Sequence, residues 1–222
     1  MKHKETSPLL RILVHLLGVT PLVIILATAL SGGLSVNPIQ DIEQRLGRSA
    51  LYLLVATLAV TPLTTLFGWH SLALHRRKLG LYAFMYFSLH FITFAVVDYG
   101  LNLQEIFRLT LEKPFIILGS LAGFILLLLA ITSFDFFMRK MGKRWKKLHR
   151  LVYIASLAVI FHYALSQKGD IFSLQGNILK PLVWGMVVVL LLVLRLPWVR
   201  RKISSLRQSF LVKRSALKDS RL

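Results

Sequence analysis

The chain alternates between long apolar runs and short polar segments. Six apolar runs can be drawn, and most approach the roughly 20 residues that a helix needs to cross a bilayer. They cover residues 9–30, 49–68, 79–98, 114–134, 148–166 and 178–198. We predict a helix for each. The expected fold is therefore an all-α membrane protein, a six-transmembrane-helix bundle forming a single transmembrane domain over residues 1–222, with a basic tail at 199–222.

The first apolar run has a second interpretation. Lys2 and Lys4 precede it and Ala27-Thr28-Ala29 ends it, a pattern that a cleaved secretory signal peptide also shows. The run is longer than the usual signal-peptide core of roughly 7–15 apolar residues, which favours a retained helix. A mature protein that began after Ala29 would have a different topology.

Basic residues gather in alternate loops. The N-terminus with Arg11, residues 76–78, residues 139–150 and the tail from Arg195 hold 22 of the 28 Lys and Arg residues. Only three acidic residues lie in or beside them, counting Asp135 just before residue 139, whereas the other loops hold six of each sign. Cytoplasmic loops carry the Lys and Arg excess, so both termini are expected in the cytoplasm. The cations form no single groove-sized patch, which argues against a nucleic-acid partner. They suit membrane lipid headgroups; a flavin phosphate or an anionic partner is the alternative.

Prolines and glycines add detail to the predicted helices. Pro21 and Pro62 should kink the first two, with threonine hydroxyls pairing the freed backbone groups. The threonines are Thr57, Thr61, Thr64 and Thr65. Gly119 and Gly123 form G-x-x-x-G, which lets a neighbouring helix approach closely and favours packing over a binding site.

The chain contains no cysteine, so disulfides, thiol catalysis, iron–sulfur ligation and c-type haem attachment are excluded. A redox metal would need histidine or another non-thiolate ligand. His90 lies twelve residues after Lys78 and His162 twelve after Arg150, the last cations before their spans. At about 1.5 Å per residue, both lie roughly 18 Å into the bilayer. Two imidazoles at equal depth can bind one iron from opposite sides, although a proton relay or a structural hydrogen bond also fits.

His149 is harder to place. It lies thirteen residues before His162 and is rotated from it by roughly 140° on a straight helix. It sits at the membrane edge, where the span at 79–98 offers no histidine of equal depth. A role as ligand or as cofactor contact stays open.

The remaining histidines have less distinctive positions. His15 lies within the first predicted helix but is shallow. His3, His70 and His75 are expected to be solvated, although His75 could fold back toward an inner cofactor.

Five segments in order resemble one family. They are NPIQDIEQRLGRSAL (37–51), LAVTPL (58–63), HRRKLGLYAFMYFSLHF (75–91), EKPFIILGSLAGFILLLLAITS (112–133) and GKRWKKLHRLVYIASLAVIFHY (142–163). Together they are similar to the MsrQ family, also called YedZ, of the ferric-reductase-like transmembrane group.

The resemblance implies a ferric-reductase-like cytochrome b that binds haem b. Haem-iron ligation carries over to His90 and His162, with His149 as a further cofactor-binding histidine of the family. Ferric reductases and NADPH oxidases use two histidines on each of two helices, whereas the span at 79–98 has only His90, so a complete second haem is not implied. The family also implies FMN, whose phosphate is expected at the inner cationic loops.

The resemblance also implies a place in electron transport. The chain would take electrons from the quinone pool or a cytoplasmic flavin reductase and carry them across the bacterial inner membrane. The acceptor would be a periplasmic molybdopterin-containing catalytic subunit of the MsrP type, which repairs methionine sulfoxide in oxidised periplasmic proteins. The chain would be the electron-transfer subunit and not the catalytic one. The short outer loops, which hold no histidine or cysteine, agree with this.

Two alternatives predict other sequence features. A self-standing ferric reductase of the same fold would add an FAD/NAD(P)H-binding domain, and no G-x-G-x-x-G-containing βαβ unit follows the sixth predicted helix. A histidine-relay transporter would have buried carboxylates and paired broken helices, which the predicted spans lack. Electron transport is the leading interpretation.

Overall fold

Helices dominate the structure. The computed structural model of the chain describes residues 7–167, 169–170, 175–176 and 178–219. In chain order the elements are α1 (Pro8–Leu30), α2 (Pro38–Phe67), η1 (His70–His75), α3 (Arg76–Ile92), η2 (Thr93–Asp98), α4 (Leu103–Glu112), α5 (Pro114–Ile131), α6 (Asp135–Met141), α7 (Lys143–Leu148), η3 (His149–Leu151), α8 (Val152–Ser166), β1 (Gly169–Asp170), β2 (Gln175–Gly176), α9 (Leu179–Val193) and α10 (Pro197–Asp219). The segments η1 and η3 are 3₁₀-helical, and η2 is a π-helical continuation of α3.

Five described segments are long and apolar enough to cross a membrane. They are Pro8–Leu30, Pro38–Phe67, His70–Asp98, Pro114–Ile131 and Lys143–Ser166. A sixth is obtained if α9 and the start of α10, which meet at 75°, count as one broken span. Pro197 begins α10, and the residue before a proline disfavours helical backbone, so the sixth helix ends earlier than expected. The predicted all-α multi-pass membrane fold is confirmed.

The second helix begins well before the apolar run at 49–68. Pro38 occupies its first turn, where a missing N–H costs nothing, and the Asn37 side chain accepts a hydrogen bond from the Gln40 N–H at 3.2 Å. Hydropathy marks where a helix enters hydrocarbon and not where its backbone turns helical. The cap, and not the apolar run, locates this helix start.

The segment between α3 and α5 contains a helix that the hydropathy pattern did not predict. The Asn102 side chain caps α4 by accepting from the Glu105 N–H at 3.1 Å. One side of α4 buries Leu109, while on the polar side the Arg108 guanidinium donates to Glu105. This bond holds the pKa of Glu105 below its usual value. An amphipathic helix this short is averaged away in a search for long apolar runs.

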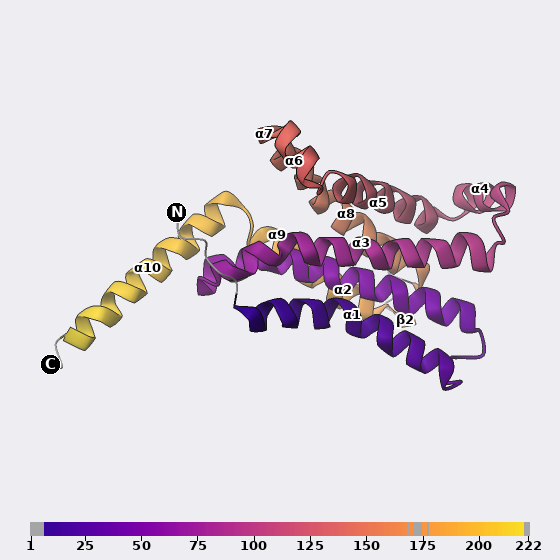
Figure 1. Cartoon of the computed structure of the whole chain (residues 1–222), viewed down its shortest axis with the longest axis horizontal. Helices are drawn as coiled ribbons and strands as arrows, with labels where there is room; N and C mark the ends of the chain where they lie inside the picture. The colour runs from indigo at the N-terminus through magenta and orange to yellow at the C-terminus, as the bar shows by residue number, and fades with distance from the viewer. Residues whose placement is uncertain (1–6, 168, 171–174, 177, 220–222) are drawn as a thin grey trace.

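Two helix pairs form the centre of the bundle. α2 packs along α3 and α5 along α8, while α1 lies against α2 and α3, and α9 against α8 and α2. The start of α1, the helices α6 and α7, and α10 lie toward one end of the bundle (Figure 1). α4 and the short antiparallel pair β1–β2 lie toward the other end. The α2–α3 and α5–α8 pairs position the candidate site.

Tyr86 of α3 enters the backbone hydrogen-bond ladder of α1. Its hydroxyl accepts from the Leu22 N–H at 2.9 Å and donates to the Gly18 carbonyl at 2.7 Å, two groups that pair with each other in a regular α-helix. Pro21 lies in the same turn, in agreement with the expected distortion. Because Tyr86 is fully buried, its phenol satisfies both backbone groups where water has no access.

A second side chain repairs the break at Pro62. Proline has no N–H, so the Leu58 carbonyl loses its partner in α2. The Arg195 guanidinium, at the end of α9, donates to that carbonyl from Nη2 at 2.7 Å and from Nε at 3.1 Å. The expectation that threonines fill this role is wrong for three of the four, because the hydroxyls of Thr57, Thr64 and Thr65 donate to the carbonyls of Leu53 and Thr61.

We predict that Tyr86→Phe lowers the free energy of unfolding by about 1–3 kcal/mol, the cost of leaving buried polar groups unpaired. Thermal unfolding of the detergent-solubilised protein measures the effect. Tyr52→Phe is the matched control, because Tyr52 is 44% exposed and its ring contact with Trp184 survives the change. Equal melting temperatures for the two variants would contradict the role given to the phenol.

Candidate functional site

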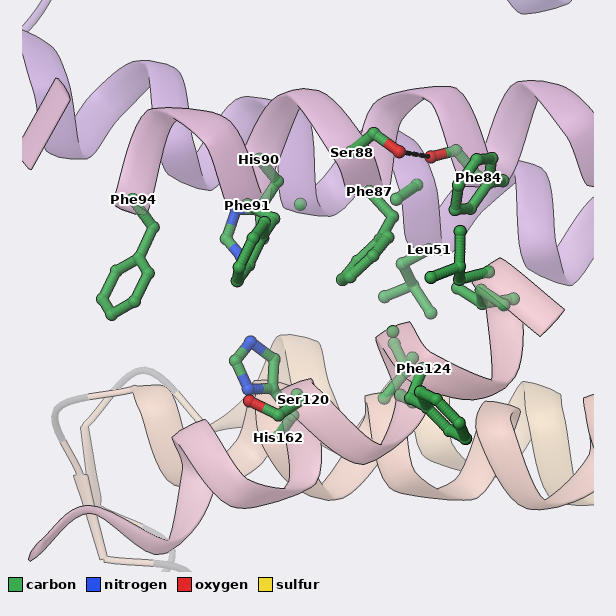
Figure 2. A pocket seen from close by; sticks show the side chains of 18 of the residues that line it. Leu51, Phe84, Phe87, Ser88, His90, Phe91, Phe94, Ser120, Phe124 and His162 are labelled. Carbon is green, nitrogen blue, oxygen red and sulfur yellow. Dashed lines mark hydrogen bonds between the residues drawn. The ribbon is translucent and has the colours of Figure 1, made fainter. Parts of the chain in front are cut away.

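The two histidines predicted from their equal depth face each other across the bundle. His90 lies on α3 and His162 on α8, with ring centroids 6.2 Å apart and ring planes at 81° (Figure 2). Their partners are alike. His90 Nδ1 lies 2.9 Å from the Glu43 carbonyl oxygen of α2, and His162 Nδ1 lies 2.7 Å from the Phe115 carbonyl oxygen of α5. Each helix pair therefore supplies one histidine and the backbone group that holds it.

The carbonyl bonds determine which ring nitrogens are available. A carbonyl oxygen only accepts, so Nδ1 of each ring carries the proton and Nε2 keeps its lone pair. Rings that bind one metal from opposite sides through nitrogens at about 2.0–2.1 Å have centroids roughly 6 Å apart. The separation of 6.2 Å between His90 and His162 matches this arrangement.

A cavity of about 550 Å³ surrounds the two rings. Its walls come from α2, α3, η2, α5 and α8 and are mainly apolar and aromatic, with Phe87 and Phe91 descending from α3 and Phe94 from η2 (Figure 2). The volume lies within the range of about 300–1,000 Å³ that is usual for ligand and cofactor sites. Phe91 and Phe124 line the cavity and are also exposed on the protein surface, so it opens sideways between α3 and α5.

The site lies in the half of the bundle that carries α4. Phe115 is the second residue of α5, which follows α4 after Lys113 alone, and Glu43 lies in the second turn of α2. Both carbonyl acceptors are thus close to the ends of their helices on the α4 side.

The described residues fit a metal that needs only two protein ligands. Among them no group of three or more His, Asp or Glu side chains could hold a metal ion. A metal bound by protein side chains alone usually needs three or four. A haem iron receives its remaining ligands from the porphyrin, so two opposed histidines in a large apolar cavity suit haem.

His149 lies apart from this cavity. Its Nε2 is 3.3 Å from the Thr132 hydroxyl oxygen, and the Trp145 ring stacks on it with 4.0 Å between centroids. The Trp145 indole N–H donates to the Thr132 carbonyl at 2.8 Å. The structure therefore brings His90 and His162 together but does not bring His149 to them.

The other histidines lie away from the cavity as well. His15 contacts the Tyr82 hydroxyl through Nδ1 at 2.7 Å and the Lys78 ammonium through Nε2 at 3.4 Å. His70 is exposed, as expected, and His3 lies outside the described residues. His75 was expected to be solvated but is only 2% exposed, and within the described part of the chain neither ring nitrogen has a hydrogen-bond partner.

Sequence reasoning missed the backbone half of the site. The Glu43 and Phe115 carbonyls act through main-chain atoms, so no residue type marks them. Each lies 47 residues before its histidine, a regularity that becomes visible only once the partners are known.

The family comparison identifies the chain as a ferric-reductase-like transmembrane protein, and its helical membrane fold agrees. Residues 46–160 match the family described as "Ferric reductase like transmembrane component". Three relatives carry the name "Protein-methionine-sulfoxide reductase heme-binding subunit MsrQ". The relative from Herminiimonas arsenicoxydans is 38% identical over 78% of both chains. The Pectobacterium atrosepticum protein is 37% identical over 84% of this chain and 90% of its own, and the Brucella ovis protein 38% identical over 88% and 86%. The chain belongs to the MsrQ family.

Proposed function

We propose that the chain is a b-type cytochrome that carries electrons across the bacterial inner membrane to a periplasmic molybdopterin-containing methionine-sulfoxide reductase of the MsrP type. The observation that carries the proposal is the opposed pair His90 and His162, each with Nδ1 tied to a carbonyl and Nε2 free for iron. The names of the relatives, which describe a haem-binding subunit of such a reductase, support it.

In this proposal His90 and His162 would hold the iron of one haem b through their Nε2 atoms. Bound haem supplies an iron that gains and loses one electron. The carbonyl bonds make both imidazoles more basic and fix their planes, and the apolar walls exclude water from the iron. These residues therefore set ligand strength, ligand orientation and solvent access.

The proposed direction of electron transfer, toward the periplasm, is supported by the position of the His90–His162 pair along the bundle. In this proposal the excess of cations assigns the first part of α10 and the basic segments at 76–78 and 139–150 to the cytoplasm, and α4 then lies on the periplasmic side. The histidine pair then lies in the outer half of the membrane. In this proposal a partner carries out the reduction itself, which agrees with the names of the relatives, each described as the haem-binding subunit of a methionine-sulfoxide reductase.

The inner side is assigned to electron entry. Quinol or a cytoplasmic flavin reductase is the proposed donor, and an FMN phosphate, where bound, pairs with the inner cationic segments. His149, which lies in η3 just before α8 and beside Trp145, is the proposed contact to a cofactor there.

We expect His90→Ala and His162→Ala each to remove or convert a low-spin haem spectrum, because each variant loses one axial ligand. Oxidised and dithionite-reduced absorption spectra of the purified proteins measure it. His70→Ala is the control, since His70 is exposed and distant in sequence from both ligands. An unchanged low-spin spectrum in the double variant His90→Ala/His162→Ala would rule out this ligand pair.

Reporter fusions test the topology. Fusions at Gln104 in α4 and at Gly169 in β1 should report the periplasm, and a fusion at Lys143 in α7 the cytoplasm. The reason is the strong Lys and Arg excess of the 139–150 segment. A periplasmic signal at Lys143 would invert the proposed arrangement.

Reconstitution tests the partner. The prereduced protein should be reoxidised when both a periplasmic methionine-sulfoxide reductase subunit and methionine sulfoxide are present, and by neither alone, because this chain provides electrons and the partner provides the catalytic centre. Stopped-flow absorption of the haem follows the reaction. Rapid turnover of methionine sulfoxide by this chain without a partner would show that it is itself the catalytic subunit.

A further inference from the structure

A helical carbonyl is an unusual acceptor for a histidine from another helix. In an α-helix the carbonyl of residue i already accepts from the N–H of residue i+4. The side chain of residue i+4 also leans back toward the N-terminus and covers that turn. An imidazole can reach such a carbonyl only where the covering side chain is absent.

Both acceptors in this site meet that condition. Gly47 lies four residues after Glu43, and Gly119 lies four residues after Phe115. A Cβ added to Gly47 would lie 3.3 Å from Nδ1 and 3.4 Å from Cε1 of His90. A Cβ added to Gly119 would lie 2.8 Å from Nδ1 and 3.0 Å from Cε1 of His162. In each case the missing side chain is the one that would meet the bonded edge of the ring.

We propose that Gly47 and Gly119 are positioning residues for the two ligands, each leaving the carbonyl one turn earlier open to the imidazole Nδ1–H. The proposal rests on the function proposed above, in which these histidines bind haem iron. The α2–α3 pair and the α5–α8 pair then share one arrangement. Each has a main-chain carbonyl that accepts the hydrogen bond, a glycine four residues after that carbonyl and a histidine 47 residues after it. G-x-x-x-G at Gly119 and Gly123 thus does more than bring helices close. Its first glycine faces a ligand ring, while a Cβ on the second would overlap the Phe87 ring.

The distances rank the expected effects. At Gly119 the new methyl group would lie closer to His162 Nδ1 than real Cβ contacts allow, so the ring or a helix must move. At Gly47 the contact with His90 is tight, so the ring would have to shift by only a few tenths of an ångström. Gly80, in the interior of α3, is the matched control, because a Cβ there meets only Thr57 Cγ2 at 3.9 Å, an ordinary contact.

The test compares Gly119→Ala, Gly47→Ala and Gly80→Ala in the full-length, haem-loaded protein. The readouts are the low-spin EPR signal, which depends on the angle between the axial ring planes, and the midpoint potential. A longer Nδ1–H to carbonyl bond makes the imidazole less basic and stabilises ferric iron less, so the midpoint potential should rise. We expect the largest EPR change and potential rise for Gly119→Ala, a smaller change in the same direction for Gly47→Ala, and parent values for Gly80→Ala.

The outcomes separate this inference from the function it rests on. Parent-like EPR signals and potentials in both Gly47→Ala and Gly119→Ala would overturn the positioning role alone. So would equal shifts in Gly47→Ala and Gly80→Ala, which would indicate a general effect of alanine. If Gly119→Ala does not yield folded protein, the comparison of Gly47→Ala with Gly80→Ala decides. A parent protein without a low-spin haem would overturn the proposed function as well.

Discussion

The hydrogen bonds from two histidine rings to two main-chain carbonyls are the constraint on which the site depends. They settle the tautomer of His90 and His162, the nitrogen each presents to the cavity and the angle between the rings. Because the acceptors belong to α2 and α5, ring orientation is coupled to how α3 packs on α2 and how α8 packs on α5. A shift in the packing of either helix pair would therefore also change the orientation of its histidine ring.

The same requirement, that no backbone polar group stay unpaired in hydrocarbon, explains the distorted helices. At Pro21 the Tyr86 phenol joins an N–H to a carbonyl, and at Pro62 the Arg195 guanidinium satisfies the carbonyl that proline leaves unpaired. Both repairs come from another helix, so each also ties two elements together. Arg195 can donate to the Leu58 carbonyl because it lies at the end of α9, where its charged guanidinium can stay near the membrane edge.

The sequence predicted what depends on hydropathy and on position along a helix. Apolar runs located the spans, and equal depth identified His90 and His162 as a pair, because both properties are periodic along the chain. It did not predict α4, which is short and is marked mainly by its cap at Asn102. Nor did it predict the hydrogen-bond partners of the two histidines, because every residue has a main-chain carbonyl and no residue type identifies the one that is used. His75 was misjudged because a polar residue beside a basic loop was taken to face water, whereas tertiary packing buries it.

The end of the bundle that carries α6 and α7 explains why only one opposed histidine pair forms among the residues that the structure describes. A second pair would need a histidine on the inner part of α3 opposite His149, but Arg76, Arg77 and Lys78 occupy those positions. Their charges favour the aqueous boundary, and cations beside a ferric iron would disfavour its oxidised state. His149 instead contacts Thr132 and Trp145 from its own side of the bundle. Under the proposed function, electrons therefore reach the His90–His162 site from a donor or cofactor bound near the inner surface, and not through a second bis-histidine centre built like the first.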